Sequence, residues 1–399
     1  MQILQRCCLH NLIVPGVLCG LPSSLPVTTV VSGGGDGTIV AEAFNVLSLC
    51  ISVLNKDSQT GDTSNLKCKL VNPSSLVMHS CLLLATVAQC LKSMGRNSAL
   101  FMLTTSPKKQ LSRLTVIAHS FSSDDKIRKA VLPHCSSAML ALASILSLEI
   151  GASVESSVSE ITIPLIPRTA TLCDHLKISS LGSNDGHTND FGQFLSHWHG
   201  FMDGCVGLLE ARLRWGGPLA VQQLCASNIP LLLVNMLAKN GSQGMDIKND
   251  QVGLSPLGLV WTVSSISHCL LGGSLTFRQI LIRNDNVKLM SDLISDAHLK
   301  LVKSWGGPGG GKSGVRDIIN VVIDLLAFPF VAVQNAPGLP SATASVNSGF
   351  LLNMGSPGGR VCMDDKDLVK AIEEDLGKYI KILIEVRPCI LNLKIGYQN

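Results

Sequence analysis

The chain has 399 residues, of which 46% are hydrophobic, 15% are charged and 4% are aromatic. This composition excludes an intrinsically disordered chain, because disorder requires low hydrophobicity and a high net charge. The net charge is only +4, and the Lys and Arg residues are dispersed along the chain. Nucleic-acid-binding proteins normally carry clustered basic residues, so the charge pattern argues against that class.

The cysteines indicate a reducing compartment. The chain has 14 of them, and none forms a C-x-x-C pair. Most lie inside apolar runs, such as Cys81 and Cys90 in SCLLLATVAQC. Cysteine thiols behave as small buried hydrophobic groups, and disulfides are rare in the cytosol. We therefore expect core thiols in a protein of a reducing compartment.

Four long runs without charge raise the alternative of a membrane-associated helical protein. Runs 7–35 and 325–359 contain several prolines, so neither can form one spanning helix of about 20 apolar residues. Runs 71–91 and 130–148 contain several polar residues. We interpret these two runs as buried helices of a large fold and expect no membrane span.

In chain order, residues 1–36 are predicted to be irregular, because prolines and a run of glycines interrupt them. Residues 37–151 are predicted to form helical repeats, with Ser123 and Asp124 capping the last helix. The helices expected there are 38–56, 73–94, 97–104, 107–121 and 124–148. Residues 152–189 are rich in proline and polar residues, which predicts a linker or surface loop.

Residues 190–386 show a tighter succession of short helices separated by Gly and Pro. The first should end at Gly216–Gly217, and Pro218 should begin the next, at a position where proline is tolerated. Later helices are expected at 228–241, 256–271, 285–296 and 314–328, the last of them ended by Pro329. Gly- and Pro-rich loops are expected at 305–314 and 329–363.

The last predicted helix has the clearest pattern. In KDLVKAIEEDLGKYIKILIEV the apolar residues share one face, and Glu374 and Lys378 form a well-oriented i,i+4 pair. These apolar residues are Leu368, Ile372, Leu376, Tyr379 and Leu383. Residues 387–399 follow as a divergent tail. Alternation with a period of two is nearly absent from the chain, so we expect no sheet.

Short successive helices that are apolar on more than one side predict an all-α fold, specifically an irregular armadillo/HEAT-like α-solenoid with long loops. The segment ASNIPLLLVNMLAKNG resembles the armadillo consensus at Asn228, Ile229, Pro230, Leu232 and Leu237. Residues 285–296 are a looser second copy. The two copies are further apart than one armadillo period, which indicates a degenerate repeat or an insertion between them.

The sequence GGPGGGKS, Gly306–Ser313, satisfies the phosphate-binding pattern G-x-x-x-x-G-K-[ST]. A phosphate cradle also needs a strand before the loop and a helix after it. The segment before it, SDAHLKLVKSW, has a helical pattern, and glycine-rich strings match the motif easily by chance. We therefore interpret Gly306–Ser313 as a loop between helices, with a nucleotide-binding enzyme as the alternative.

Two further patterns resemble functional sites. Asp190-Phe191-Gly192 reads as the magnesium-binding DFG triplet of protein kinases, but no other kinase motif accompanies it. We interpret it as the start of a helix, with Asn189 or Asp190 as the cap.

A second cluster contains His197, His199, Asp203 and Cys205. On a helix, side chains two residues apart point to different sides, so the two histidines cannot share a zinc ion. We interpret the cluster as a partly buried helix face and assign no catalytic, cofactor-binding or metal-binding residue.

Two long strings, residues 198–237 and 307–359, carry a specific resemblance. They resemble the non-catalytic, armadillo-type region of the plant Fused-type serine/threonine protein kinases. The similarity is strongest from about Asp190 to Val386 and extends upstream to about Ser32. The resemblance implies a kinase domain elsewhere in the parent protein and a helical tail that acts in cytokinesis.

The same resemblance implies a protein partner, a phragmoplast kinesin, and a cytoplasmic, cytoskeleton-associated location at the phragmoplast and the expanding cell plate. The chain has no kinase motif, so no catalytic residue is carried over and no kinase activity is expected. Its unpatterned end after Pro388 predicts a fragment of a longer protein. No nucleic acid, cofactor or small-molecule substrate is expected.

Overall fold

A computed structural model describes residues 1–11, 13–18, 73–93, 125–148, 188–216, 229–240, 254–271, 286–334 and 376–385, with a few single positions between them. The labelled helices are α1 (Gln2–His10), α2 (Ile13–Leu18), α4 (Pro73–Ser93), α6 (Asp125–Leu146), α8 (Thr188–Trp215), α10 (Ile229–Asn240), α11 (Pro256–Leu271), α12 (Asn286–Leu293), α13 (Asp296–Ser304) and α14 (Gly311–Gln334). Residues 376–385 form a further helix. These residues contain no strand, so the predicted all-α fold is confirmed for them.

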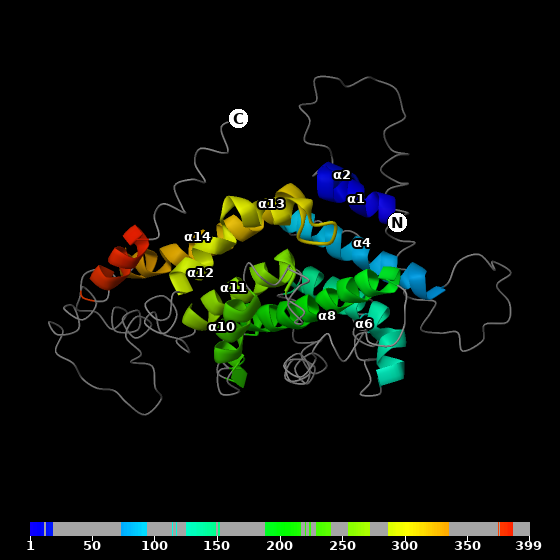
Figure 1. Ribbon diagram of the computed structural model, residues 1–399, viewed down its shortest axis with the longest axis horizontal. Coiled ribbons are helices and arrows are strands. Elements are labelled where there is room, and N and C mark those ends of the chain that lie inside the picture. Colours follow the sequence, from blue (N-terminus) through cyan, green and yellow to red (C-terminus); the bar gives the residue numbers. More distant parts are fainter. Residues whose placement is uncertain are drawn as a thin grey trace, which may run out of the picture.

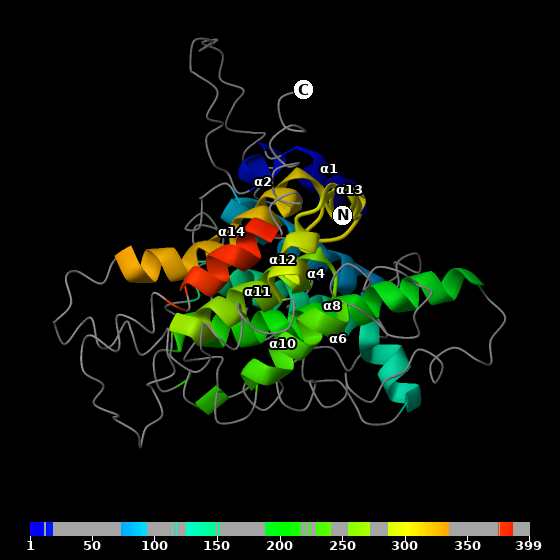
Figure 2. The ribbon, with the colours of Figure 1, turned by 60° about the vertical axis from the view of Figure 1, so that its left-hand side comes forward.

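Figure 1 shows α1 and α2 above α4, with α6, α8 and α10 below α4 and α14, and Figure 2 shows the same order. Along the chain, α4 packs on α6, α6 on α8, α8 on α11, and α11 on α14. α14 then returns to contact α4 and α1. The described helices therefore surround a common core, while the repeat-by-repeat stacking of a solenoid stays a prediction.

One hydrophobic core joins these helices. Met139 of α6, Phe201 of α8 and Trp261 of α11 are all fully buried in it. α6 and α8 each pack against two neighbours, which explains why they are apolar on more than one side. Cys8, Cys81, Cys90, Cys135, Cys205 and Cys269 are also buried, as predicted for core cysteines.

Several predicted helices are confirmed with small shifts at their ends. The range 73–94 corresponds to α4, 124–148 to α6 and 256–271 to α11. α8 ends before Gly216, whose N–H donates to the Arg212 carbonyl at 2.9 Å. The predicted pair in the last helix is also present, with Lys378 Nζ 3.1 Å from Glu374 Oε1.

The prediction that residues 1–36 are irregular was wrong for their first half. α1 and α2 occupy Gln2–His10 and Ile13–Leu18. Cys8 and Leu9 of α1 are buried, and α1 packs on α4 and α14. Packing on the rest of the protein can stabilise a helix this short, which local sequence signals cannot reveal.

Pro329 does not end α14, contrary to the prediction of a loop over 329–363. The helix continues through Pro329 to Gln334. Proline removes one backbone N–H and disturbs the preceding turn. The Tyr379 hydroxyl donates to the Leu326 carbonyl in that turn at 2.6 Å, and the Tyr379 ring lies 5.7 Å from that of Phe330. These contacts with the 376–385 helix stabilise the segment on both sides of Pro329.

Other predicted segments lie outside the described residues. They are the helix 38–56, most of the two helices within 97–121, and residues 152–187 of the predicted linker. The loop over 335–363 and the tail 387–399 also lie outside.

By length and composition, one helix among the described residues could cross a membrane. It is α4, over Leu76–Ser93. However, 67% of that window is buried inside the protein, and α4 packs on α1, α6 and α14. A core helix has the same composition, and α4 is placed as one.

The loop between α13 and α14 is closely packed. Pro308, Gly309 and Gly310 are buried, and Gly309 and Gly311 have positive φ angles of 85° and 70°. A Cβ atom on Gly309 would lie 2.6 Å from the Leu257 Cβ, and one on Gly311 would lie 2.5 Å from the Leu9 carbonyl oxygen. Glycine is therefore required because this loop is wedged between α11 and α1. The predicted loop over 305–314 is shorter than expected, since α14 begins at Gly311.

We expect the substitution Gly309→Ala to lower the free energy of unfolding by at least about 1–2 kcal/mol, because alanine resists positive φ and its methyl group would meet Leu257. Urea denaturation would measure this loss. Gly306→Ala is the matched control in the same loop, since no atom lies within 4 Å of the new methyl group. Equal stability losses in both variants would contradict the packing explanation.

Candidate functional site

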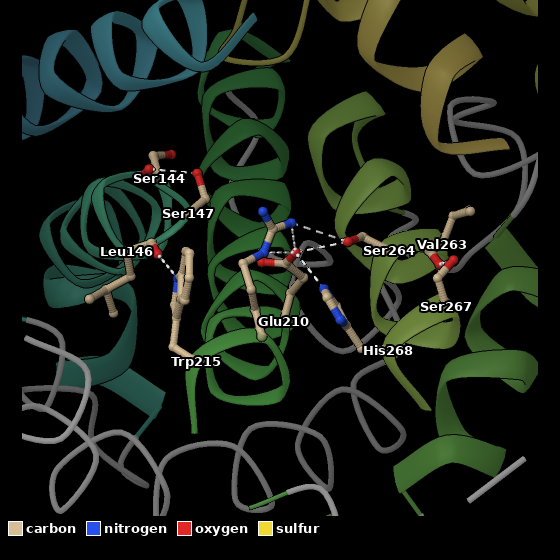
Figure 3. A network of polar contacts seen from close by, with 10 residues as sticks. Ser144, Leu146, Ser147, Glu210, Trp215, Val263, Ser264, Ser267 and His268 are labelled. Carbon is tan, nitrogen blue, oxygen red and sulfur yellow. Dashed lines mark hydrogen bonds and ion pairs between the residues drawn. The ribbon is translucent and has the colours of Figure 1, made fainter. Parts of the chain in front are cut away.

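Charged side chains meet in the interior where α8 faces α11 (Figure 3). The Glu210 side chain of α8 is fully buried. Its Oε1 atom accepts hydrogen bonds from the Arg214 guanidinium, with Nε at 2.9 Å, and from the Ser264 hydroxyl of α11 at 2.8 Å. His268 of α11 places its Nε2 atom 3.7 Å from the same oxygen. Two helices therefore share one buried carboxylate.

The surroundings of Glu210 keep it ionised. Burial alone would raise the pKa of this carboxyl, because the charged form loses its hydration. The contact with His268 and the positive charges of Arg214 and Lys92 outweigh burial and hold the pKa of Glu210 well below its usual range. The result is a buried anion that faces positive charges from α4 and α8 and the His268 imidazole of α11.

Lys92 of α4 extends this network to α14. Burial lowers the pKa of Lys92, while the Glu210 charge opposes that shift. On the other side, burial raises the pKa of Asp317 to about 6, against the influence of Lys92 and Ser93. Arg316 also donates to the Ser93 carbonyl at 3.4 Å. The network therefore links α4, α8, α11 and α14.

The link to α6 is made by the neighbouring Trp215. Its indole Nε1 donates to the Leu146 carbonyl at 2.8 Å, where α6 ends (Figure 3). The Arg214 guanidinium lies over the same indole ring, 5.9 Å from its centroid. The last turn of α8 is thereby fixed on both sides.

A second buried carboxylate, Asp203 of α8, lies at the amino end of α11. Its Oδ1 accepts the Ser255 N–H at 3.0 Å, and its Oδ2 accepts the Ser255 hydroxyl. A negative group at this position complements the amino end of α11. Gly258 leaves room for it, since a Cβ there would lie 2.1 Å from Oδ1. Burial raises the pKa of Asp203 to about 7, although the hydrogen bonds from Ser255 lower it.

These two clusters bind helices together and have little capacity for catalysis. Glu210 and Asp203 are both buried, and most of their acceptor positions are used by neighbouring side chains, although Glu210 Oε2 has no hydrogen-bond partner. A general acid or base must reach a substrate. Within the residues that the structure describes, no three His, Cys, Asp or Glu side chains are grouped so that they could hold a metal ion.

The phosphate-binding interpretation of Gly306–Ser313 finds no structural support. The element before the loop is helix α13, not a strand. The loop backbone is turned against Leu257 and Leu9, and the Ser313 hydroxyl is buried and donates to the Gly310 carbonyl at 3.4 Å. Lys312 is exposed in the first turn of α14. The glycines thus allow the loop to pack closely against α11 and α1.

The kinase-like triplet Asp190-Phe191-Gly192 lies inside α8, which begins at Thr188. It is helical, as predicted, although the predicted caps Asn189 and Asp190 lie within the helix. His197 and His199 belong to the same helix.

The other two members of that histidine cluster are buried. Cys205 packs in the core, and Asp203 binds Ser255 instead of a metal.

Sequence reasoning missed the Glu210 network. One local signal was present, because Glu210 and Arg214 are an i,i+4 pair inside the apolar run LLEARLRW. A charged pair within an apolar run indicates that the charges are buried together. The convergence of Lys92 and His268 on this pair has no local signal, since both are far away in sequence.

The fold and these clusters define an all-helical protein region whose buried polar groups are structural. No family model matches the chain, and no solved structure is similar to it. The chain is 61% identical over 389 residues to the serine/threonine-protein kinase TIO of Arabidopsis thaliana. That alignment covers 96% of this chain and 29% of the kinase. The predicted resemblance is thereby confirmed, and the chain is homologous to a region of a plant serine/threonine kinase.

We expect Glu210→Gln to lower the free energy of unfolding by about 2–4 kcal/mol, because it leaves the partly buried Arg214 and Lys92 without their counter-ion. Urea denaturation at neutral pH would measure the loss. Glu374→Gln, at an exposed pair, is the control and should change stability little. Because the pKa of Glu210 is lowered, its contribution is lost as pH falls below the ordinary value of 4.5, so the difference between variant and parent should shrink in acid.

Asp203 should produce a pH dependence of the opposite sign. Its folded-state pKa of about 7 lies above the ordinary value of 3.8, so the folded protein binds the proton more tightly than the unfolded chain. The stability contributed by this proton is present in acid and is lost as pH rises to about 7. The substitution Asp203→Asn should therefore become more favourable, relative to the parent, between pH 4 and 7. A constant difference in unfolding free energy over this range would contradict the assignment.

Proposed function

We propose that this chain is a non-catalytic, protein-docking region of a plant Fused-type serine/threonine kinase. The observation that carries the proposal is the 61% identity to the kinase TIO over 96% of the chain. The chain spans only 29% of that kinase, so the kinase's activity belongs to a protein much longer than this region. The DFG triplet lies inside helix α8.

The physical character of the region supports docking. Its buried charges bind α4, α8, α11 and α14 into one body, which gives a fixed arrangement of outer helix faces. A rigid surface loses little conformational entropy when a partner binds. The outer faces of α14 and the 376–385 helix carry exposed apolar side chains, including Ile323, Phe330 and Ile384.

By its resemblance to the Fused-type kinases, the region acts in plant cytokinesis. We infer that it places the kinase at the phragmoplast and the expanding cell plate by binding a phragmoplast kinesin. The location is then cytoplasmic and cytoskeleton-associated. The proposal requires no nucleic acid, no membrane span and no small-molecule substrate.

The two alternatives draw less support from the described residues. A nucleotide-binding enzyme would use Gly306–Ser313, but helix α13 precedes that loop and its glycines pack against α11 and α1. A membrane-associated protein would use α4, which is mostly buried between other helices.

A pull-down with the purified chain as bait tests the docking function. We expect it to retain the tail of a phragmoplast kinesin and not the tail of a kinesin that acts elsewhere. The Glu210→Gln variant should retain less of that tail if the fixed arrangement of helices is required. No enrichment, under conditions in which the full-length kinase binds the same tail, would contradict the proposal.

A further inference from the structure

Three helices meet at one edge of the molecule, where α1 ends, α13 ends and α14 begins (Figures 1 and 2). A Cβ atom on Gly311 would lie 2.5 Å from the Leu9 carbonyl oxygen, so the start of α14 lies against the end of α1. A Cβ atom on Gly314 would lie 3.4 Å from the Val302 side chain, so the first turn of α14 also lies against α13. Leu9, Val302 and Gly311 are all buried.

The residue that follows each of these three is exposed and basic. His10 follows Leu9, Lys303 follows Val302, and Lys312 follows Gly311. The contacts of their buried neighbours bring the backbone of these three basic residues to the same junction of α1, α13 and α14. Arg6 and Arg316, about one turn from His10 and Lys312 on α1 and α14, are also exposed. We call these five residues the basic junction.

Among the described residues of the three helices, few acidic side chains accompany the basic junction. On α1, α13 and the first two turns of α14 there are two acidic residues, Asp296 and Asp317. Asp296 already pairs with Lys300, with Nζ at 2.8 Å. Asp317 is turned inward toward Lys92 and Ser93. In the part of the chain that the structure describes, Arg6, Lys303 and Lys312 form no ion pair.

Exposed apolar side chains accompany these charges. Ile3 on α1 is 78% exposed, and Leu301 on α13 is 45% exposed. Ile3 lies three residues before Arg6, so these two side chains share one face of α1, while Leu301 is an exposed apolar residue of α13. Interfaces of this kind combine apolar anchors with charges that orient the partner.

We propose that the basic junction binds an acidic segment of a protein partner, with apolar side chains of that segment resting on Ile3 and Leu301. This inference rests on the proposed docking function and names its site and the chemistry of its partner. Unpaired cations and the near absence of acidic groups make the junction complementary to Asp- and Glu-rich sequence. The apolar side chains favour a peptide over a nucleic acid, and their placement on separate helices lacks the continuous apolar face of a membrane-binding helix.

An array of synthetic peptides that differ in Asp, Glu, Lys and Leu content is the probe, with the intact, labelled chain as the reagent. Peptides that combine acidic residues with Leu should be retained, and basic peptides of the same Leu content should not. The double variant Lys303→Glu/Lys312→Glu should bind the selected peptides about tenfold more weakly or worse. Added salt should weaken binding by the parent, because exposed charges are screened.

Lys378→Glu/Lys381→Glu is the matched control. It makes the same change in net charge at exposed positions of the 376–385 helix, and its binding should stay within about twofold of the parent. All four lysines are exposed, so circular dichroism should show folded protein in both variants. Equal losses in the two variants, or no loss in the first, would overturn the proposal.

Vesicles containing phosphatidylserine provide the second arm. Binding to vesicles that requires Lys303 and Lys312, without selection of acidic peptides, would overturn the proposal in favour of a lipid surface. The kinesin-tail pull-down is then repeated with the Lys303→Glu/Lys312→Glu variant. Retention of the tail at the level of the parent would reject the basic junction while leaving the docking function intact.

Discussion

The arrangement of the helices depends on keeping Glu210 ionised in the interior. A buried carboxylate is stable only when cations and hydrogen-bond donors replace the water that it has lost. Arg214 is supplied by the same helix, but Ser264 and His268 come from α11 and Lys92 from α4. α4, α8 and α11 must therefore hold definite positions and rotations about their axes. Apolar packing alone tolerates many such arrangements, whereas this network is satisfied by few.

The same need for exact placement explains the glycine-rich segment before α14. Its pattern suits a phosphate site, yet each glycine that matters allows a close backbone contact with α11 or α1. These contacts bring α1, which is remote in sequence, against the start of α14. They also bring exposed basic residues of three helices to one edge. A packing requirement thus creates a surface that none of the three helices has by itself.

The homology covers only part of a kinase, and the remainder makes up most of that protein's length. Fixed helix faces and unneutralised surface charge are the properties by which such a region would position an enzyme.

The sequence by itself determined the all-α class and the extents of helices such as α4, α6 and α11, because apolar periodicity and helix-breaking residues are local properties. It also determined which strings resemble a kinase family. It could not place α1 and α2, which are short and depend on packing, nor the continuation of α14 through Pro329, which the 376–385 helix stabilises through Tyr379. The partners of Glu210 and the meeting of His10, Lys303 and Lys312 were decided by tertiary structure alone, because these contacts join residues far apart in the chain.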